Sequence, residues 1–534
     1  MTVPEYLPLD ENEDWPTHGE YEYSAYYHSR RQVHEFSEQL SPSFDYIVIG
    51  AGPIGAALAF KLSTDHPAQQ ILIVEKSWDE PDRIVGELMQ PAGCQALELL
   101  GLGRVFSGIG AVPVHGYYIA YGGKQLYVPY PLNPNGKPFR GVSFHHGRLV
   151  MNLRAACKSR DNITCLEASV VELLRDSDGL SPVRGVRVAA ARDNNQKEHK
   201  EVTARRITFV CDGISSQFRK VLNPEPVALI SHFCGLVLEH EPVSTADHFT
   251  GPAGAIPASL RADPHTQKEN PLPMPHNGHV LLDGLGPVLL YQMSERETRI
   301  LADIPGPTLP SDGSQLRALV RDSLSRAAPK QMYPALHARL MDAVDGAQRL
   351  RCIGSKFIPA TANRIPGAVW IGDALNVRHP LTGGGMTVGL WDIVHLCKQM
   401  SKEDHSPRAL NRMTAQWQWD RRSRALVVNT LSVALHALFA AADSPDMCLL
   451  RDACFSYLSR GSFYTMHPSG FLSGLFPSPL LLLFHFFSVA LLAVTMRLGD
   501  PKAGILPIRC LSAAHTLWVA ACVILPFMWR ELRP

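Results

Sequence analysis

Short apolar runs recur along this 534-residue chain, each followed closely by glycine or by an acidic residue. Three of them are Ile47–Ile49, Ile71–Val74 and Val369–Ile371. Apolar runs this short predict buried β-strands, because a strand covered on both faces has apolar side chains at successive positions. The segment from Ala56 to Leu62, downstream of the first run, predicts a helix. The pattern therefore predicts the strand, turn and helix units of an α/β fold.

Two longer segments place apolar residues at helical spacing. They are Leu316–Leu340, which Pro329 interrupts, and Met413–Leu438. A stripe of this kind is usually core packing, so no chemistry is assigned to it.

Two apolar runs near the C-terminus differ from the rest of the chain, Leu480–Met496 and Leu511–Trp529. At about 1.5 Å per residue the first covers about 25 Å as a helix, the short end of what spans a bilayer. We expect a hairpin that crosses the membrane or dips into one leaflet, and the alternative is a buried helical hairpin. Interfacial anchors at the flanks predict that both ends face the cytosol. These anchors are Trp518, Trp529, Arg497, Lys502, Arg509, Arg530 and Arg533.

A glycine-rich turn lies between the first predicted strand and its helix, and it consists of Gly50, Ala51, Gly52, Pro53, Ile54 and Gly55. Small residues let the backbone approach a pyrophosphate, whose charge the helix N-terminus would hold. Glu75 ends the second strand, where a carboxylate can accept hydrogen bonds from an adenosine ribose. An ordinary glycine-rich turn is the alternative. The strand, the helix and the carboxylate together favour a dinucleotide site.

A second element decides which dinucleotide is expected. The strand at Val369–Ile371 ends in Gly372-Asp373, and this carboxylate can reach a flavin ribityl hydroxyl. The following Gly383, Gly384 and Gly385 can bring backbone N–H groups against a flavin ring, and a helix begins near Met386. An NAD enzyme has no use for this element, so FAD is the predicted cofactor.

Asp212-Gly213 follows a third apolar run and precedes another helix start. An Asp-Gly turn with a serine cap is the alternative explanation of this segment. In chain order, the glycine turn, Asp-Gly and Gly-Asp resemble the flavoprotein monooxygenases.

Composition excludes several classes of protein. The net charge of +1 with 19% charged residues gives no basic excess for binding nucleic acid. Eleven cysteines without CxxC spacing predict reduced thiols rather than a disulfide framework. Residues 1–43 have no apolar stretch, so they predict a mobile tail and not a secretory signal. His145 and His146 are not expected to share a metal, because adjacent residues of a strand face opposite ways.

Three longer strings resemble the squalene monooxygenase family, also called squalene epoxidases. They are Glu80–Pro91, His145–Arg148 and Arg378–Thr387, and the likeness extends from about Phe44 to the C-terminus, including Tyr457–Phe487. Two departures are Lys76 and Leu88, where Arg and Phe are common in the family. This chain also lacks the hydrophobic N-terminal segment of many animal members.

The resemblance implies further site residues. For FAD it implies Lys76, Arg83, Leu88, Arg148 and Val170, and a guanidinium fork suits a pyrophosphate. A surface ion pair is the alternative for each arginine. At the substrate edge it implies Tyr117 and Gln90, with a hydrogen bond between them. The alternative for Tyr117 is a partly buried core tyrosine.

The resemblance also implies a p-hydroxybenzoate-hydroxylase-like FAD fold with an interleaved α+β substrate domain and a C-terminal membrane-associated helical region. The expected boundaries are a tail (1–43), an FAD-binding domain (44–225 and 346–395), a substrate domain (226–345) and the helical region (396–534).

The implied activity is epoxidation of a terminal double bond of squalene to 2,3-oxidosqualene through a flavin hydroperoxide, in sterol or triterpenoid biosynthesis. The implied partners are O2, an NADPH-dependent flavoprotein reductase and membrane lipid. The implied location is the endoplasmic reticulum membrane, with the catalytic domain facing the cytosol. One alternative is epoxidation of another prenyl chain in a specialised terpenoid pathway. A non-enzyme alternative is a GDP-dissociation-inhibitor-like protein, against which Glu75 and Asp373 argue.

Overall fold

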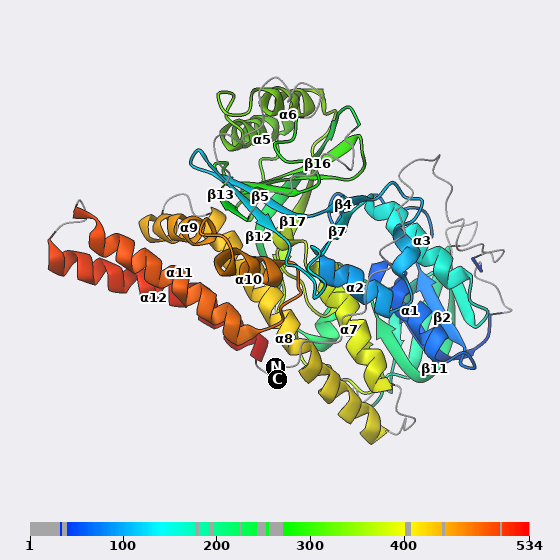
Figure 1. Cartoon of the computed structure of the whole chain (residues 1–534). Helices are drawn as coiled ribbons and strands as arrows, with labels where there is room; N and C mark the ends of the chain where they lie inside the picture. Colours follow the sequence, from blue (N-terminus) through cyan, green and yellow to red (C-terminus); the bar gives the residue numbers. More distant parts are fainter. Residues whose placement is uncertain are drawn as a thin grey trace.

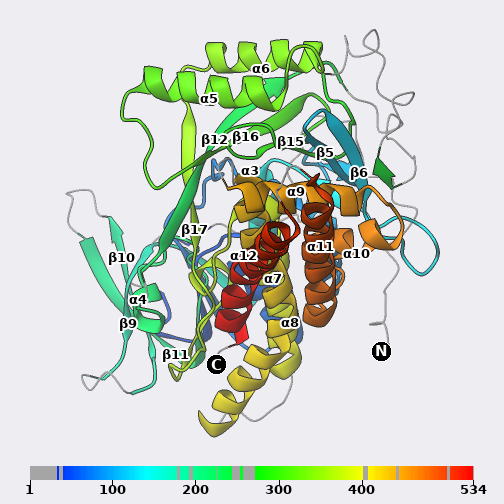
Figure 2. The ribbon, with the colours of Figure 1, turned by 90° about the vertical axis from the view of Figure 1, so that its left-hand side faces the viewer.

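The computed structural model describes residues 33–34, 40–176, 181–191, 197–224, 226–242, 253–255, 271–400, 407–440, 444–501 and 505–532. Most of the expected tail, together with Lys502 and Arg533, lies outside the described residues. Two large β-sheets form the body, and the C-terminal helices lie along one side of it (Figures 1 and 2). The molecule therefore consists of an α/β unit, a second sheet and a layer of helices, which meet at its centre.

The first sheet is the predicted dinucleotide-binding unit, with strand order β8-β2-β1-β11-β10-β9 and β18 beside the end of β11. The strands β8, β2, β1, β11 and β18 run parallel. Their bounds are β1 (Ser43–Ile49), β2 (Ile71–Glu75), β8 (Ile163–Glu167), β9 (Ser169–Leu174), β10 (Gly185–Ala191), β11 (Lys197–Val210) and β18 (Ala368–Trp370). The three apolar runs of the sequence all lie in this sheet.

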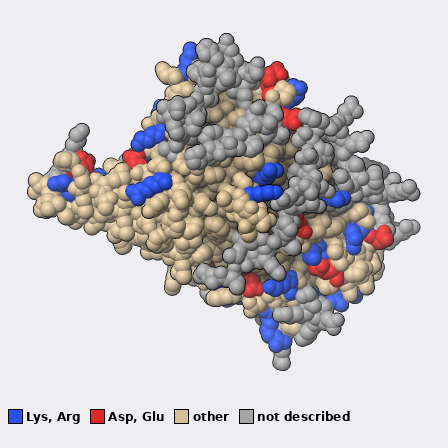
Figure 3. All heavy atoms as spheres, viewed as in Figure 1, with Lys and Arg blue, Asp and Glu red and all other residues tan. Residues whose placement is uncertain are grey.

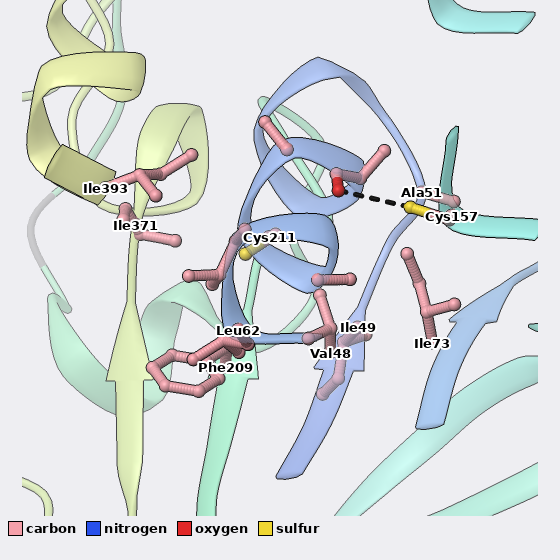
Figure 4. Packing of buried hydrophobic residues seen from close by; sticks show 14 of the residues in the cluster. Val48, Ile49, Ala51, Leu62, Ile73, Cys157, Phe209, Cys211, Ile371 and Ile393 are labelled. Atoms are coloured by element: carbon pink, nitrogen blue, oxygen red, sulfur yellow. Dashed lines mark hydrogen bonds between the residues drawn. The ribbon is translucent and has the colours of Figure 1, made fainter. Parts of the chain in front are cut away.

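Helix α1 (Pro53–Asp65) connects β1 to β2 and packs on the sheet. Leu62 of the helix lies beside Phe209 and Val48 of two neighbouring strands (Figure 4). On its other side, the Cys157 thiol of α3 (His146–Lys158) donates to the Ala56 carbonyl across 3.2 Å. The parallel strands are buried on both faces, which explains their continuous apolar runs.

The second sheet has strand order β13-β6-β5-β14-β15-β16-β12-β17. The bounds are β5 (Gly116–Tyr121), β6 (Lys124–Pro129), β12 (Ala228–Glu239), β13 (Gly254–Ala255), β14 (Gly278–Leu281), β15 (Val288–Gln292), β16 (Glu297–Pro305) and β17 (Arg351–Phe357). β5, β6 and β17 belong to this sheet although they lie outside the expected substrate-domain range 226–345. The chain crosses between the two sheets more often than the boundaries anticipated.

A third, small sheet joins the two large ones, with order β3-β7-β4. Its strands are β3 (Leu88–Met89), β4 (Val112–Val114) and β7 (Gly141–Ser143). Beside it, Glu87 is buried and forms an ion pair with Arg299 of β16, with two N–H···O distances of 2.8 Å. Fully paired charges of this kind fix how the small sheet sits on the second sheet.

Helices complete both units. The helices before the C-terminal region are α2 (Pro91–Leu99), α4 (Arg219–Leu222), α5 (Gly313–Ala327), α6 (Pro334–Gly346) and α7 (Gly385–Met400). Helices α5 and α6 cover the second sheet, and the break between them begins just before Pro329, as the sequence predicted. Short 3-10 turns span Gly103–Phe106, Gly372–Ala374 and Pro380–Thr382.

The C-terminal region contains α8 (Pro407–Ala440), α9 (Pro445–Leu458), α10 (Phe463–Leu472), α11 (Pro479–Gly499) and α12 (Leu506–Leu532). Within the described part of the chain, three helices are long and apolar enough to cross a membrane: α8 is 67% buried over its most apolar window, whereas α11 and α12 are each 22% buried. Helix α8 is therefore a core helix, in agreement with the sequence. The exposure of α11 and α12 excludes the buried helical hairpin.

Helices α11 and α12 form an arm that projects from the body (Figure 1). Uncharged side chains make up most of its visible surface (Figure 3). Large apolar side chains on the arm are at least half exposed: Leu480, Phe484, Leu491, Ile508, Leu511, Trp518, Trp529 and others. So large an apolar patch on a protein surface marks a lipid or protein contact.

A buried ion pair joins α7 to α8. Arg421 donates from Nε and Nη2 to the two carboxylate oxygens of Asp392, each across 2.9 Å, and both residues are 2% exposed. We expect Arg421→Met to lower the free energy of unfolding by about 3–5 kcal/mol, because it leaves a buried carboxylate unpaired. The double variant Asp392→Leu/Arg421→Met should lose less. Arg412→Met, at an exposed position of α8, is the control.

Urea unfolding of the detergent-solubilised protein, followed by tryptophan fluorescence, measures these differences. A double variant as unstable as the single one would show that the arginine acts through packing alone.

Candidate functional site

The glycine turn after β1 has the conformation that its sequence predicted. Gly50 has φ +96° and donates its N–H to the Val74 carbonyl across 2.7 Å. A Cβ on Gly55 would lie 1.9 Å from the Gly50 oxygen, so no other residue fits there. A Cβ on Gly52 would meet nothing within 4 Å, because this glycine faces open space. Gly52 precedes α1 without a capping side chain, and Pro53 begins the helix, which leaves first-turn N–H groups available to an anion.

Glu75 closes this turn from the end of β2. Its Oε2 accepts from the Ala51 N–H across 2.8 Å, and its Oε1 accepts from the Lys76 N–H across 3.1 Å. The carboxylate is therefore fixed beside the glycine turn, and it keeps acceptor capacity for a hydroxyl group.

Arg154 is a site residue that the sequence did not reveal. Its Nε donates to the Ala51 carbonyl across 3.0 Å, and its Nη1 donates to the Asp79 carbonyl across 2.8 Å. Its Nη2 lies 3.9 Å from Glu75 Oε2. Burial lowers the pKa of this arginine from its usual value, and the nearby acidic groups oppose that effect. Arg154 adds a buried positive charge to the expected pyrophosphate end.

Two aspartates follow the ends of neighbouring parallel strands, Asp212 after β11 and Asp373 after β18. Burial raises the pKa of both carboxyl groups, and Arg219 near both of them partly opposes this. Asp373 remains open to the cavity although protein surrounds its other sides. Asp212 Oδ1 is buried without a hydrogen-bond partner. Both carboxylates are thus available to a polar ligand.

A cavity of about 610 Å³ collects most of the predicted cofactor residues. Those that line it are Gly50, Gly52, Pro53, Ile54, Glu75, Lys76, Arg83, Leu88, Asp212, Asp373, Gly385 and Met386. Gln90, Tyr117, His146, Arg154 and Arg378 line it as well. Residues that lie more than three hundred positions apart in the chain therefore share one cavity.

Four predicted residues do not line this cavity, namely Gly55, Arg148, Val170 and Gly384. Gly55 supports the turn from behind. Arg148 donates to the Ile109 carbonyl across 3.3 Å instead. The Val170 carbonyl accepts from Gln217, in the segment after Asp212. A Cβ on Gly384 would lie 2.4 Å from Val428 Cγ1, so this glycine allows the close approach of α8.

The two adjacent histidines belong to a helix start and not to a strand, which corrects the sequence prediction. His145 precedes α3 and its Nε2 lies 2.8 Å from Glu297 Oε2, whereas His146 Nδ1 lies 3.0 Å from the Gly86 carbonyl oxygen. They face different partners, and only His146 lines the cavity.

The predicted hydrogen bond between Tyr117 and Gln90 is confirmed, and it belongs to a larger set. Tyr117 and Tyr130 each donate a hydroxyl to Gln90 Oε1 across 2.8 Å. Gln90 Nε2 donates to the Thr382 carbonyl across 2.9 Å. Burial raises the pKa of Tyr117, so its hydroxyl stays protonated as the donor. Tyr130 and Thr382 were absent from the predicted site.

A second cavity, of about 140 Å³, lies on the other side of this group. Its walls are mostly apolar side chains of β5, β6 and all five C-terminal helices, including Ile119, Leu435, Phe439, Leu450, Phe471 and Leu482. Tyr117, Val280, Leu381 and Thr382 line both cavities. The cavity that holds the charged residues and the apolar cavity thus share a wall made of four residues.

Comparison with known proteins decides the family. The squalene epoxidase family model matches residues 204–250 and 265–510. The squalene epoxidase of Schizosaccharomyces pombe is 36% identical over 494 residues, which cover 91% of this chain and 98% of the yeast protein. This chain belongs to the squalene epoxidase family. The squalene monooxygenase of Mus musculus is 34% identical, over 92% of this chain and 78% of the mouse protein.

Solved structures agree on the fold. The p-nitrophenol 4-monooxygenase of Pseudomonas putida aligns with a TM-score of 0.59 at 15% identity, over 82% of this chain and 99% of that protein. A probable FAD-dependent monooxygenase of Pseudomonas aeruginosa aligns with a TM-score of 0.53 at 17% identity, over 82% and 100%. The flavoprotein monooxygenase fold predicted from the sequence is confirmed, with membrane-compatible helices added at the C-terminus. Membership of the family also removes the GDP-dissociation-inhibitor alternative.

Proposed function

We propose that this protein is an FAD-dependent monooxygenase that epoxidises a terminal double bond of squalene, giving 2,3-oxidosqualene. The observation that carries the proposal is the wall shared by the cavity of about 610 Å³, which holds the glycine turn and the acidic residues, and an apolar cavity, in a chain of the squalene epoxidase family. Because the two cavities adjoin, a hydrocarbon in the apolar cavity can reach a cofactor bound in the larger one without passing through water. Squalene and O2 are the proposed substrates.

The residues of the larger cavity fit FAD. Gly52 faces open space at the N-terminus of α1, where a pyrophosphate would find backbone donors, and Arg83 and Arg154 add positive charge. Glu75 would hold the ribose. The unpaired Oδ1 of Asp212 and the open carboxylate of Asp373 would accept hydroxyl hydrogens of the ribityl chain. Bound and reduced, FAD supplies the activation of O2 for transfer to an alkene.

This chain's own contribution is position and the exclusion of water. Gln90 holds Tyr117 at the wall, so the tyrosine ring is fixed at the edge where the two cavities meet. The apolar lining keeps water from the reacting end, which protects an activated oxygen from loss. The smaller cavity is below the about 300–1,000 Å³ of sites for drug-sized ligands, so a long polyene requires the lining helices to move apart.

The proposed attachment is to the membrane, through α11 and α12. Both helices keep one face on the body and expose apolar side chains on the other. Asp446 of α9 accepts from Thr516 of α12 and lies 3.1 Å from Arg497 Nη2 of α11. Because α9 is tied to both helices beside their connecting turn, we propose that the arm dips into one leaflet. The endoplasmic reticulum, with the catalytic body in the cytosol, is the proposed location.

Electrons are proposed to come from NADPH through a separate flavoprotein reductase. Among the described residues, one glycine-turn strand and helix unit carries the dinucleotide features. Rapid bleaching of the flavin by NADPH alone would contradict a separate reductase.

A second candidate is epoxidation of a prenyl chain that bears an oxygen. The observation in its favour is a polar pair in the apolar cavity, Tyr457 and His485, whose Oη and Nδ1 atoms lie 2.8 Å apart. A hydrocarbon makes no use of such a pair.

Cofactor binding is tested with Asp373→Ala. We expect it to weaken FAD binding by about 10- to 100-fold while the chain stays folded, because it removes an open charged acceptor and no core contact. Absorbance of the flavin after dilution and gel filtration measures the loss. FAD should be released entirely on denaturation of the wild type. Colour that stays with the precipitated chain would contradict noncovalent binding.

Substrate turnover is tested with Tyr117→Phe. We expect turnover of squalene to fall by about 3- to 10-fold with FAD retained, because one buried hydrogen bond at the wall is lost. Tyr118→Phe is the matched control: it loses a hydroxyl contact with Tyr333 of 2.9 Å but lines neither cavity. Mass spectrometry of the products, with reductase and NADPH, measures both. If squalene yields no oxidosqualene while a prenylated aromatic is epoxidised, the second candidate replaces the first.

Membrane attachment is tested by ending the chain after Ser478. We expect the shortened protein to leave the membrane pellet and to retain FAD, because residues lining the FAD cavity all precede α11. A milder variant, Leu511→Glu/Trp518→Glu, should weaken pelleting with the apolar cavity intact. Leu132→Glu, exposed on the body, is its control. Retention of the shortened chain after a carbonate wash would place the anchor elsewhere.

A further inference from the structure

A buried group of polar side chains lies behind the shared wall and lines neither cavity. Asp303 of β16, Ser231 of β12 and His379 are each fully buried, and His436 of α8 is 7% exposed. Ser231 Oγ lies 2.5 Å from Asp303 Oδ1 and 3.0 Å from His379 Nε2. His436 Nε2 lies 2.8 Å from Asp303 Oδ2. The group therefore connects the second sheet, α8 and the segment before the Pro380–Thr382 turn.

Donors and acceptors can be assigned consistently to the hydrogen bonds of this group. His379 Nδ1 accepts from the Leu381 N–H across 3.2 Å, so the proton of a neutral His379 is assigned to Nε2. His379 then donates to Ser231, and Ser231 donates to Asp303. Although burial alone would raise the pKa of Asp303, the contacts with His379 and His436 hold it at about 2. Asp303 is thus an ionised carboxylate that accepts from both sides.

Asp303, His379 and His436 come close enough together to share a metal ion. The two imidazole rings are stacked, however, with centroids 4.0 Å apart and planes 29° apart. A ligand nitrogen holds a metal in the plane of its own ring, and stacked rings direct their nitrogens side by side rather than toward one point. The geometry favours hydrogen bonding over metal coordination.

The group leads to the site through the Pro380–Thr382 turn. His379 caps this turn at the Leu381 N–H, and the Thr382 carbonyl at its other end accepts from Gln90. Leu381 and Thr382 are two of the four residues that line both cavities. The turn is therefore linked to the second sheet through His379, and to Tyr117 and Tyr130 through Gln90.

We propose that Asp303, Ser231 and His379 are positioning residues that hold the Pro380–Thr382 turn against Gln90. They would thereby fix the position of the wall that the two cavities share. Because none of the three lines the cofactor cavity, their effect falls on the alignment of the alkene and not on FAD binding. The proposal rests on the proposed epoxidase function for its catalytic consequence. Its structural half concerns the turn alone.

The test uses the full-length protein with two variants. Ser231→Ala removes the bridge to Asp303. His379→Asn keeps a side-chain acceptor for the Leu381 N–H but is too short to reach Ser231. The matched control is Ser323→Ala, a fully buried serine of α5 whose hydroxyl accepts from the Leu285 N–H across 3.2 Å. It loses one buried hydrogen bond in the same domain and takes no part in the hydrogen bonds that join Asp303, Ser231 and His379.

Two measurements are made on each variant. Hydrogen exchange followed by mass spectrometry reports the amides from Leu381 to Met386. Turnover with reductase reports the share of NADPH oxidation that yields epoxide rather than hydrogen peroxide. We expect faster exchange at the turn and about tenfold poorer coupling in Ser231→Ala and His379→Asn, with FAD retained, because a small displacement at a reacting centre is costly. The control should show neither change.

Unchanged exchange at the turn in Ser231→Ala would overturn the proposal, as would equal effects in Ser323→Ala. Loss of FAD from Ser231→Ala would also overturn it, since the group would then support the cofactor cavity. A wild-type protein that forms no epoxide would refute the proposed function instead, and the exchange measurement would still decide the role of the turn.

Discussion

The Gln90 side chain accepts hydrogen bonds from Tyr117 and Tyr130 and donates one to the Thr382 carbonyl, and Tyr117 and Thr382 belong to the wall shared by the larger cavity and the apolar one. The three partners come from different parts of the fold: Tyr117 from β5, Tyr130 from the segment after β6, and Thr382 from the turn before α7. The primary amide of Gln90 accepts through its oxygen and donates through its nitrogen, with both atoms in one plane. The arrangement of the wall is therefore specified by hydrogen-bond direction as well as by packing. A different arrangement of these side chains would leave a buried polar group without a partner.

Local chemistry made much of the cofactor cavity predictable. Gly50, Gly55 and Glu75 belong to one strand, turn and helix unit, so their spacing together with the strand and the helix indicated that they would lie together. Asp212 and Asp373 were predictable for a related reason, since the ends of parallel strands meet at one edge of a sheet. Arg148 and Arg154 show the limit. Six residues along a helix rotate a side chain by about 240°, so Arg148, which lies in the family-like string His145–Arg148, faces Ile109, while Arg154 reaches the Ala51 carbonyl of the glycine turn.

Other parts of the architecture depend on pairings that no local pattern encodes. β5 and β6 follow the first part of the dinucleotide unit in sequence, yet β5 pairs with β14, more than a hundred and fifty residues later. β17 likewise returns to pair with β12. Pairing between strands so far apart in the chain is decided by which apolar faces cover each other. The sequence shows which faces are apolar but not which face packs on which. The same limit applies to Gly384, whose missing side chain serves the approach of α8 and not the cofactor cavity.

Helix α11 shows how the exposed apolar surface of the arm and the apolar cavity are physically continuous. Leu482, His485, Phe486 and Val489 line the apolar cavity, whereas Leu480, Phe484 and Leu491 of the same helix are more than half exposed. Positions three, four and seven apart share one face of a helix, so a single element lines the cavity with one face and exposes apolar side chains on the other. A long hydrocarbon is nearly insoluble in water, and its transfer from bilayer to an apolar cavity changes its hydration very little. The driving force for binding must then come from fit within the cavity. Ordering of the chain against the wall that Gln90 fixes is consequently where selectivity for a terminal double bond can arise.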